Sequence, residues 1–506
     1  MPLTEIHLDP KSRIPLYLQI KEQIKDLILK DILPEGKRLL PTRELARILG
    51  VNRSTIVSAY NELLAEGFIE SRVGRGTVVM KKKPAQESDY NYEPLNWSEF
   101  FAYFPKTNHY SLYRDSDSLF TQEDIISLGT GVPDPKYYPF NDFQKIISKL
   151  LKEKGRIMLQ LSSVEGCYPL RETIADWFNF EGKSTSPGEV LITSGSNQGL
   201  YLLAETLLNP EDLVVVENPT SMNALRIFRA AGPKIIDIPV DETGMKVDIL
   251  ENLLSRQRVK MVYTVPTFQN PSGTVLSLSR RKKLLDLAYK YHVPIIEDDP
   301  YSKLYYERIP PLSLKALDKH NNVIYLGTFS KILFPGLRIG WIVAAKPVIK
   351  QLMPVKRLVD LHSNTLEQHA FYEYCNQGLL EKHLQKVRKI YAKKRDLTIA
   401  ALKKCCSNLI DWNKPEGGYY LWCQLRGGLN STDLLREAFY EKVEFIEGKI
   451  FSTKEDREEW LRLNFSYLDE DLIEEGINRF SKALCKLRKR HKIGSSKEVS
   501  SVKPII

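Results

Sequence analysis

The residues with the clearest chemical potential surround Lys331, which follows the apolar run Val323–Leu326. That run is typical of a buried strand, so the lysine should lie just past a strand end. Two hydroxyls and an arginine flank it: Thr328, Ser330 and Arg338. Hydroxyls and an arginine suit a phosphate, and a lysine in a partly dry pocket suits a Schiff base because desolvation lowers its pKa. A lone Ser-Lys pair is usually only surface sequence, so the rest of the chain decides.

Three further polar motifs also follow apolar runs. Gly195-Ser-Asn-Gln-Gly199 should open a helix whose first amides, at Ser196 and Asn197, could hold a phosphate. Asn270-Pro-Ser-Gly273 and Asp298-Asp-Pro-Tyr301 each come after another run. Each motif alone predicts only a turn or a strand end, whereas the set in this order predicts a site.

Seven apolar runs alternate with helical stretches from Ser127 onward. They are Val190–Thr193, Val214–Glu217, Ile235–Ile238, Lys260–Val265, Pro294–Glu297, Val323–Leu326 and Trp341–Ala345. This alternation predicts an open, mostly parallel, seven-stranded α/β sheet. Ligands on such sheets bind beyond the carboxyl ends of the strands, where the polar motifs fall.

The first eighty residues have a different pattern. We predict three helices, about Leu16–Ile28, Thr42–Leu49 and Ser54–Glu66, and two short strands, Phe68–Ser71 and Thr77–Met80. This order is that of a winged helix-turn-helix, an α+β fold. The third helix and the hairpin tip should contact DNA, in the major groove and along the backbone or minor groove respectively. The residues concerned are Asn52, Arg53, Ser54, Thr55, Gly74, Arg75 and Gly76.

This head resembles the GntR-type DNA-binding domain, through P-L-Y-L-Q-I-K-E-Q-I, L-P-T-R-E-L-A-R-I-L-G-V-N-R-S-T-I and G-R-G-T. The resemblance implies double-stranded DNA as a partner. It also implies a set of contacting positions: Arg43, Asn52, Arg53, Ser54, Thr55 and Gly74.

The remaining motif set resembles the fold-type I aminotransferases that use pyridoxal 5′-phosphate (PLP), which also carry a small domain. With its head, the whole chain resembles MocR-type transcriptional regulators, which implies a homodimer. We expect a head at 1–80, an aromatic-containing linker at 81–126, an aminotransferase-like domain at 127–480 and a basic tail at 481–506.

The resemblance implies a role for each motif. Lys331 would form the Schiff base with PLP, and Asp298 would pair with the pyridine nitrogen, which keeps the ring an electron sink. Asn270 and Tyr301 would donate to the ring oxygen. The phosphate would lie among Ser196, Asn197, Thr328, Ser330 and Arg338. Arg462, in Trp460-Leu-Arg-Leu-Asn-Phe-Ser466, would grip a carboxylate bidentately.

Two positions depart from the enzyme pattern. Ser221 stands where the family has an aromatic residue stacked on the ring, and Leu161 where it has a tyrosine that donates to the phosphate. These losses should loosen the cofactor without abolishing binding, so we expect weak transaminase activity at most.

Composition and charge narrow the class of protein. The chain has 506 residues, 42% of them hydrophobic, and shows neither a membrane-length apolar run nor a signal peptide, so we expect a cytoplasmic protein. Its six cysteines and eight histidines lack ligand spacing, so we expect no metal site. The net charge of +10 lies at the chain ends. The basic tail predicts either nonspecific DNA attraction or a solvated end.

Three functions remain open at this point. The chain could be a regulator that senses PLP or an amino-acid-like effector, a working aminotransferase with a DNA-binding head, or a scaffold without cofactor. Lys331, Asp298 and Asn270 argue against the scaffold, while Ser221 and Leu161 favour the sensor. The effector, the operator and the sign of regulation do not follow from the residues.

Overall fold

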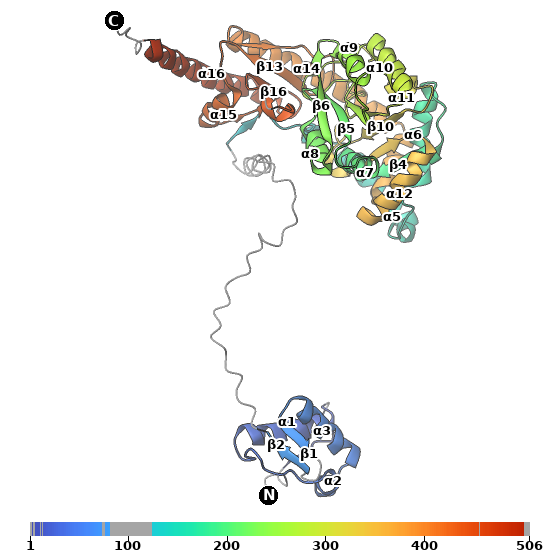
Figure 1. The fold of residues 1–506 in the computed structure, drawn as a ribbon, viewed down its shortest axis with the longest axis vertical. Helices are drawn as coiled ribbons and strands as arrows, with labels where there is room; N and C mark the ends of the chain where they lie inside the picture. Colours follow the sequence, from blue (N-terminus) through green and yellow to red (C-terminus); the bar gives the residue numbers. More distant parts are fainter. Residues whose placement is uncertain are drawn as a thin grey trace. The chain divides into compact units, whose positions relative to one another are not determined.

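The structure is a computed structural model that describes Leu3 and residues 6–10, 12, 14–72, 76–80, 124–454 and 456–499. The chain divides into two compact units, Met1–Ala102 and Tyr103–Ile506 (Figure 1). Most of the predicted linker, residues 81–123, lies outside the described residues.

The first unit is the predicted winged helix-turn-helix. It contains α1 (Leu16–Leu29), α2 (Thr42–Leu49), α3 (Arg53–Ala65), β1 (Ile69–Arg72) and β2 (Gly76–Val79). The strands pair antiparallel, with Ile69 opposite Val79. Helix α2 ends at Gly50, whose φ of 63° is left-handed, and the Asn52 side chain caps α3. The helices pack through fully buried residues that include Ile20, Ile24, Ile56 and Leu63.

The second unit is built on an eight-stranded sheet, ordered β4-β11-β10-β9-β8-β5-β6-β7. Its strands are β4 (Val190–Thr193), β5 (Leu213–Asn218), β6 (Lys234–Asp241), β7 (Gly244–Met245), β8 (Met261–Thr264), β9 (Ile295–Asp299), β10 (Val323–Thr328) and β11 (Gly340–Val343). The seven predicted strands are confirmed, and the two-residue β7 is added at the edge. Strand β11 pairs antiparallel with both neighbours, as does β7 with β6, and the other pairs are parallel.

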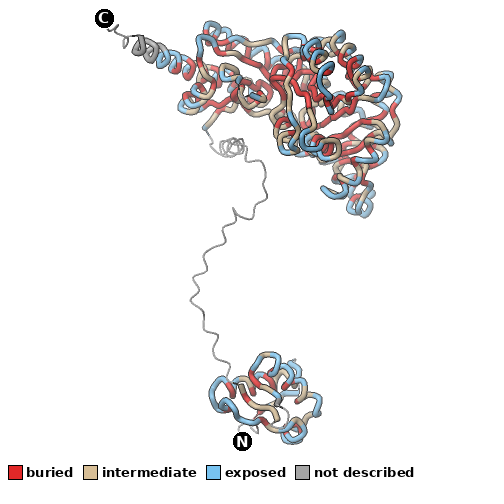
Figure 2. Tube along the Cα trace, in the orientation of Figure 1, coloured by how far each residue is buried: buried red, intermediate tan, exposed pale blue. Residues whose placement is uncertain are grey.

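Helices cover both faces of this sheet. Because its strands are buried on both sides, their sequences are continuous apolar runs. Val214 and Val216 of β5 face α7 (Ser196–Leu207), α8 (Met222–Ala231) and α12 (Lys346–Asp360). Val215 faces the opposite side, with α9 (Val247–Leu254), α10 (Leu278–Tyr291) and α11 (Leu314–Leu317). The buried colour follows these strands in Figure 2.

Further helices complete the second unit. They are α5 (Phe140–Met158), α6 (Tyr168–Phe180), α13 (Thr365–Asn376), α14 (Leu379–Cys406), α15 (Ser431–Tyr440) and α16 (Glu470–Val499). Helix α16 crosses the predicted boundary at residue 480, and Ala483 and Leu484 beyond it are fully buried. Packed structure therefore continues into the predicted tail.

A second, four-stranded sheet has the order β12-β13-β16-β15. Its strands are β12 (Ile410–Trp412), β13 (Tyr420–Leu425), β15 (Ile446–Glu447) and β16 (Trp460–Asn464), while β3 (Ile126–Ser127) pairs with β14 (Val443–Glu444). Among the helices that the structure describes, none has both the length and the apolar character needed to cross a membrane.

Candidate functional site

Lys331 lies three residues beyond the end of β10, where the sequence predicted it. Its Nζ donates to the carbonyl oxygen of Gly131 at 2.6 Å. Burial lowers the pKa of Lys331, because the charged ammonium is poorly solvated there. A lowered pKa favours the role of a nucleophile, because the neutral amine is the form of a lysine that attacks.

Asp298 is the next-to-last residue of the neighbouring strand β9. Its Oδ2 accepts from the hydroxyl of Tyr263 at 2.6 Å, while its buried Oδ1 has no partner among the described residues. Burial raises the pKa of Asp298 to about 6. A buried carboxylate oxygen without a donor is costly, so the site is suited to a ligand that carries an N–H.

The N-terminus of α7 and Arg338 form the next part of the site. Ser196 and Asn197 are the first two residues of α7, so their amides have no acceptor within the helix. Arg338 donates from Nη2 to the carbonyl of Ser194 at 2.8 Å. A Cβ on Gly195 would lie 2.7 Å from that guanidinium. Helix amides and an arginine together have the chemistry that suits a phosphate.

Gly340, at the start of β11, brings a second piece of backbone against this turn. A Cβ there would lie 2.6 Å from the carbonyl carbon of Gly195 and 2.8 Å from the amide nitrogen of Ser196. Thr328 and Ser330 are both buried, and the Thr328 hydroxyl donates to Ser330 Oγ at 3.1 Å. The predicted phosphate residues thus come from three connected segments of the sheet edge.

Arg462 lies on β16 and is 4% exposed. It donates from Nη1 to Asn270 Oδ1 at 2.9 Å and from Nη2 to the carbonyl of Gly129 at 3.0 Å. Its Nε is buried without a partner among the described residues. The guanidinium lies 4.1 Å from the ring centre of Tyr420 and 5.0 Å from that of Phe451. A buried arginine with a free donor is suited to an anion.

Asn270 and Tyr301 lie between these groups. Asn270 contacts Arg462, as described above. Tyr301 is 1% exposed and shares a 2.9 Å hydrogen bond with the hydroxyl of Tyr420. The electrostatic field of Tyr420 acts in turn on Lys331. The predicted site residues of the second unit are therefore brought to one edge of the sheet.

Sequence reasoning missed Tyr263 and Tyr420. Tyr263 lies within the buried strand β8, where a tyrosine is interpreted as a core residue. Its contact with Asp298 becomes apparent only from the neighbouring strand β9. Tyr420 begins β13, which belongs to the second sheet. No local motif marks either residue, because both act through contacts distant in sequence.

The two departures from the enzyme pattern have different surroundings. Ser221 precedes α8, and its hydroxyl interacts electrostatically with Tyr263, whose pKa is raised by burial and by Asp298. It therefore lies beside the acid of the site. Leu161 is 81% exposed.

In the first unit, the predicted DNA-contacting residues 52–55 lie at the start of α3, and Arg43 lies at the start of α2. Arg43, Asn52, Arg53 and Ser54 are exposed and Thr55 is partly exposed. Gly74 and Arg75 lie outside the described residues. The described positions leave the start of α3 accessible, as a recognition helix requires.

Comparisons with known proteins match both units. Residues 123–480 match the model for aminotransferase class I and II, and residues 16–79 match that for bacterial regulatory proteins of the gntR family. The uncharacterized HTH-type transcriptional regulator YisV of Bacillus subtilis is 34% identical over 478 residues, which are 94% of this chain and 97% of YisV.

This chain belongs to the aminotransferase class I and II family, with a gntR-family head. Aromatic-amino-acid aminotransferase 1 of Thermococcus litoralis is 38% identical over 396 residues, which are 77% of this chain and 95% of that protein. The structure of Pyrococcus horikoshii kynurenine aminotransferase, solved with PMP, has a TM-score of 0.74 and 40% identity. The match covers 77% of this chain and 98% of the kynurenine aminotransferase chain.

The residues of this family member fit PLP. The unpartnered Asp298 Oδ1 offers an acceptor for a pyridine N–H. Burial lowers the pKa of Lys331, which favours an amine that condenses with an aldehyde. The α7 terminus with Arg338 provides positive potential for a phosphate.

Proposed function

We propose that this chain is a PLP-dependent transcriptional regulator that senses an amino-acid-like effector. Its head binds double-stranded DNA, and its aminotransferase-like part holds PLP at Lys331. One observation carries the proposal: a gntR-family head is joined to an aminotransferase site that retains Lys331, Asp298 and Arg462. We also propose a homodimer, so that two heads read two half-sites.

In this proposal different residues bind the ring nitrogen, the ring oxygen and the phosphate of the cofactor. Asp298 accepts from the pyridine nitrogen, and Asn270 and Tyr301 lie toward the ring oxygen. The phosphate lies among Ser196, Asn197, Thr328, Ser330 and Arg338. When bound, PLP supplies an aldehyde that condenses with amines and a ring that withdraws electrons.

Arg462 would select the effector by its carboxylate. The arginine is already oriented by Asn270 and Gly129, and its Nε is free to donate. Lys331 Nζ, whose pKa is lowered by burial, would be the proton acceptor of the site when the effector amine binds.

The experiment is an absorbance spectrum of the purified full-length protein, before and after a panel of amino acids. The wild type should be yellow and its spectrum should change with the effector. Lys331→Ala should lose the colour of the lysine-bound cofactor and remain folded. Lys350→Ala, at an exposed position of α12, should keep it. A colourless wild type after addition of PLP would overturn the proposal.

A second candidate, a working aminotransferase, is favoured by the 38% identity to the Thermococcus litoralis enzyme. Catalysis needs the ring held within about 1 Å of its place, and Ser221 supplies no stacking face. We therefore expect little keto acid when an amino donor and a keto acceptor are both supplied. Sustained turnover at about 1–10³ per second would favour the enzyme instead.

A further inference from the structure

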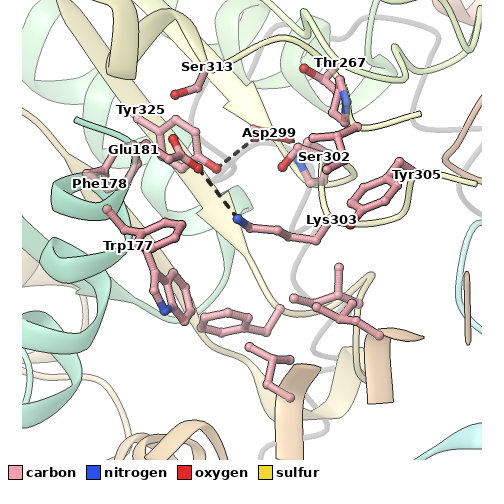
Figure 3. Close-up of a pocket in the computed structure, with 18 of the residues that line it drawn as sticks. Trp177, Phe178, Glu181, Thr267, Asp299, Ser302, Lys303, Tyr305, Ser313 and Tyr325 are labelled. Carbon is pink, nitrogen blue, oxygen red and sulfur yellow. Dashed lines mark hydrogen bonds and ion pairs between the residues drawn. The ribbon is translucent and has the colours of Figure 1, made fainter. Parts of the chain in front are cut away.

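The cavity drawn in Figure 3 lies beside β9 and β10. Its volume is about 390 Å³, and Asp298 is not among the residues that line it. Seven aromatic residues line the cavity, among them Trp177, Tyr325, Phe329 and Trp341. Trp177 of α6 meets the rings of Phe329 and Trp341 edge to face, with centroids 5.9 and 6.0 Å apart. This volume and lining match a small-molecule site with an apolar body.

Asp299 is one of three carboxylates that line this cavity, with Glu181 and Glu381. Successive residues of a strand point to opposite faces, so Asp299 faces away from the cofactor side, which Asp298 occupies. Asp298 accepts from Tyr263, whereas Asp299 accepts from Tyr325 at 2.9 Å. Thr328, predicted for the cofactor phosphate, also lines the cavity, so the two sites lie back to back.

Asp299 is 6% exposed and bonded only to neutral donors in the described ranges, the Tyr325 hydroxyl and the backbone amide of Ser302. No lysine or arginine of the described residues lies within ion-pair distance of it. Buried carboxylates are normally paired with a cation. A ligand with a positive charge would supply the cation that this carboxylate lacks, and the ion pair would favour binding.

The other charges near the cavity have partners. Glu181 forms an ion pair with Lys303 at 3.7 Å, and burial raises the pKa of Glu181. Figure 3 marks this pair with a dashed line. Glu381 pairs with Arg388 at 3.1 Å. With these pairs satisfied, Asp299 is the acid that remains for a ligand.

We propose that this cavity binds a small organic cation carried on an aromatic or apolar body. Asp299 pairs with its charge, and the aromatic rings enclose its body and present their π faces to the cation. The ligand needs no reactive amine, because the cavity lies on the other side of β9 from Lys331. This inference does not depend on the proposed function.

Benzyltrimethylammonium tests the site because a quaternary ammonium cannot condense with the PLP aldehyde. Binding to the full-length protein saturated with PLP is followed by calorimetry and by tryptophan fluorescence. We expect saturable binding with no change in cofactor absorbance. 2-Phenylethanol, which is uncharged, and 3-phenylpropionate, which is anionic, should bind at least about tenfold more weakly.

Variants separate this cavity from the cofactor site. Asp299→Asn should weaken benzyltrimethylammonium at least about tenfold, and Trp177→Leu should weaken it with the fold retained, since Trp177 is only partly buried. Lys331→Ala should bind it as the wild type does. Equal binding by Trp177→Leu and the wild type, loss of binding in Lys331→Ala, or a preference for phenylpropionate would overturn the proposal.

Discussion

Arg462 is held by two acceptors and two aromatic rings before any ligand binds. Such preorganisation reduces the entropy lost when a carboxylate arrives. Arg462→Ala should therefore keep the cofactor colour but lose the spectral response to the effector. A hydrogen bond to a charged group contributes about 1.5–3 kcal/mol, so affinity should fall at least about tenfold.

The measurement is an effector titration followed by absorbance. Arg426→Ala is the matched control, because Arg426 is an exposed arginine that pairs with Asp411. A normal response in Arg462→Ala would refute the assignment.

Glu217 gives a pH-dependent prediction. It is 1% exposed and accepts from Thr264, Val265 and Gln269, and burial raises its pKa to about 7. Because the folded pKa lies above the unfolded value, this group stabilises the fold fully below about pH 4, and that stability is lost as pH rises through 7.

Glu217→Gln should flatten the dependence of the unfolding free energy on pH between 5 and 7.5, by up to about 3 kcal/mol. Urea unfolding of the second unit, at several pH values, measures this. Glu211→Gln, at a side chain that is 73% exposed, should leave the slope unchanged. The same slope in Glu217→Gln as in the wild type would contradict the prediction.

At the scale of elements, the long patterns were predictable and the short or distant ones were not. The seven sheet strands have apolar runs of four residues or more, while β7 has two residues and forms by folding back on β6. Lys331 and Asp298 follow strand ends, which a sequence reveals. The pairing of Asp298 with Tyr263 depends on which strands are neighbours in the sheet, and a sequence does not reveal that order.

The head carries its own prediction through α3. Arg53 is its first residue and exposed, with the helix N-terminus capped by Asn52. Arg53→Ala should weaken binding to a specific operator by about 1–3 kcal/mol. Titration of labelled duplexes at physiological salt measures the loss.

Asn61→Ala, eight residues further along the same helix and also exposed, is the control and should bind normally. Equal affinity of the wild type for the operator and for random duplex would count against sequence-specific recognition.

For the whole molecule, sensing requires the effector to bind two conformations unequally. We expect the effector to change operator affinity about 5–150-fold, and operator DNA to change effector affinity by the same factor, since coupling is reciprocal. Titrations in both directions on the full-length protein test this. Lys331→Ala should bind operator with no effector dependence, and unequal factors in the wild type would exclude simple coupling.

The close approach at Gly340 also limits how this family member can diverge. Backbone atoms of Gly195 and Ser196 stand 2.6 to 2.9 Å from where a side chain would begin, and a backbone cannot rotate aside. At Gly195 the obstacle is the movable end of Arg338, together with a φ of 97°. Position 340 is therefore closed to every substitution unless the turn before α7 is rebuilt with it. A descendant that changed residue 340 but kept the turn before α7 would lose the structure of its phosphate site. That loss would come before any change in the chemistry of the site.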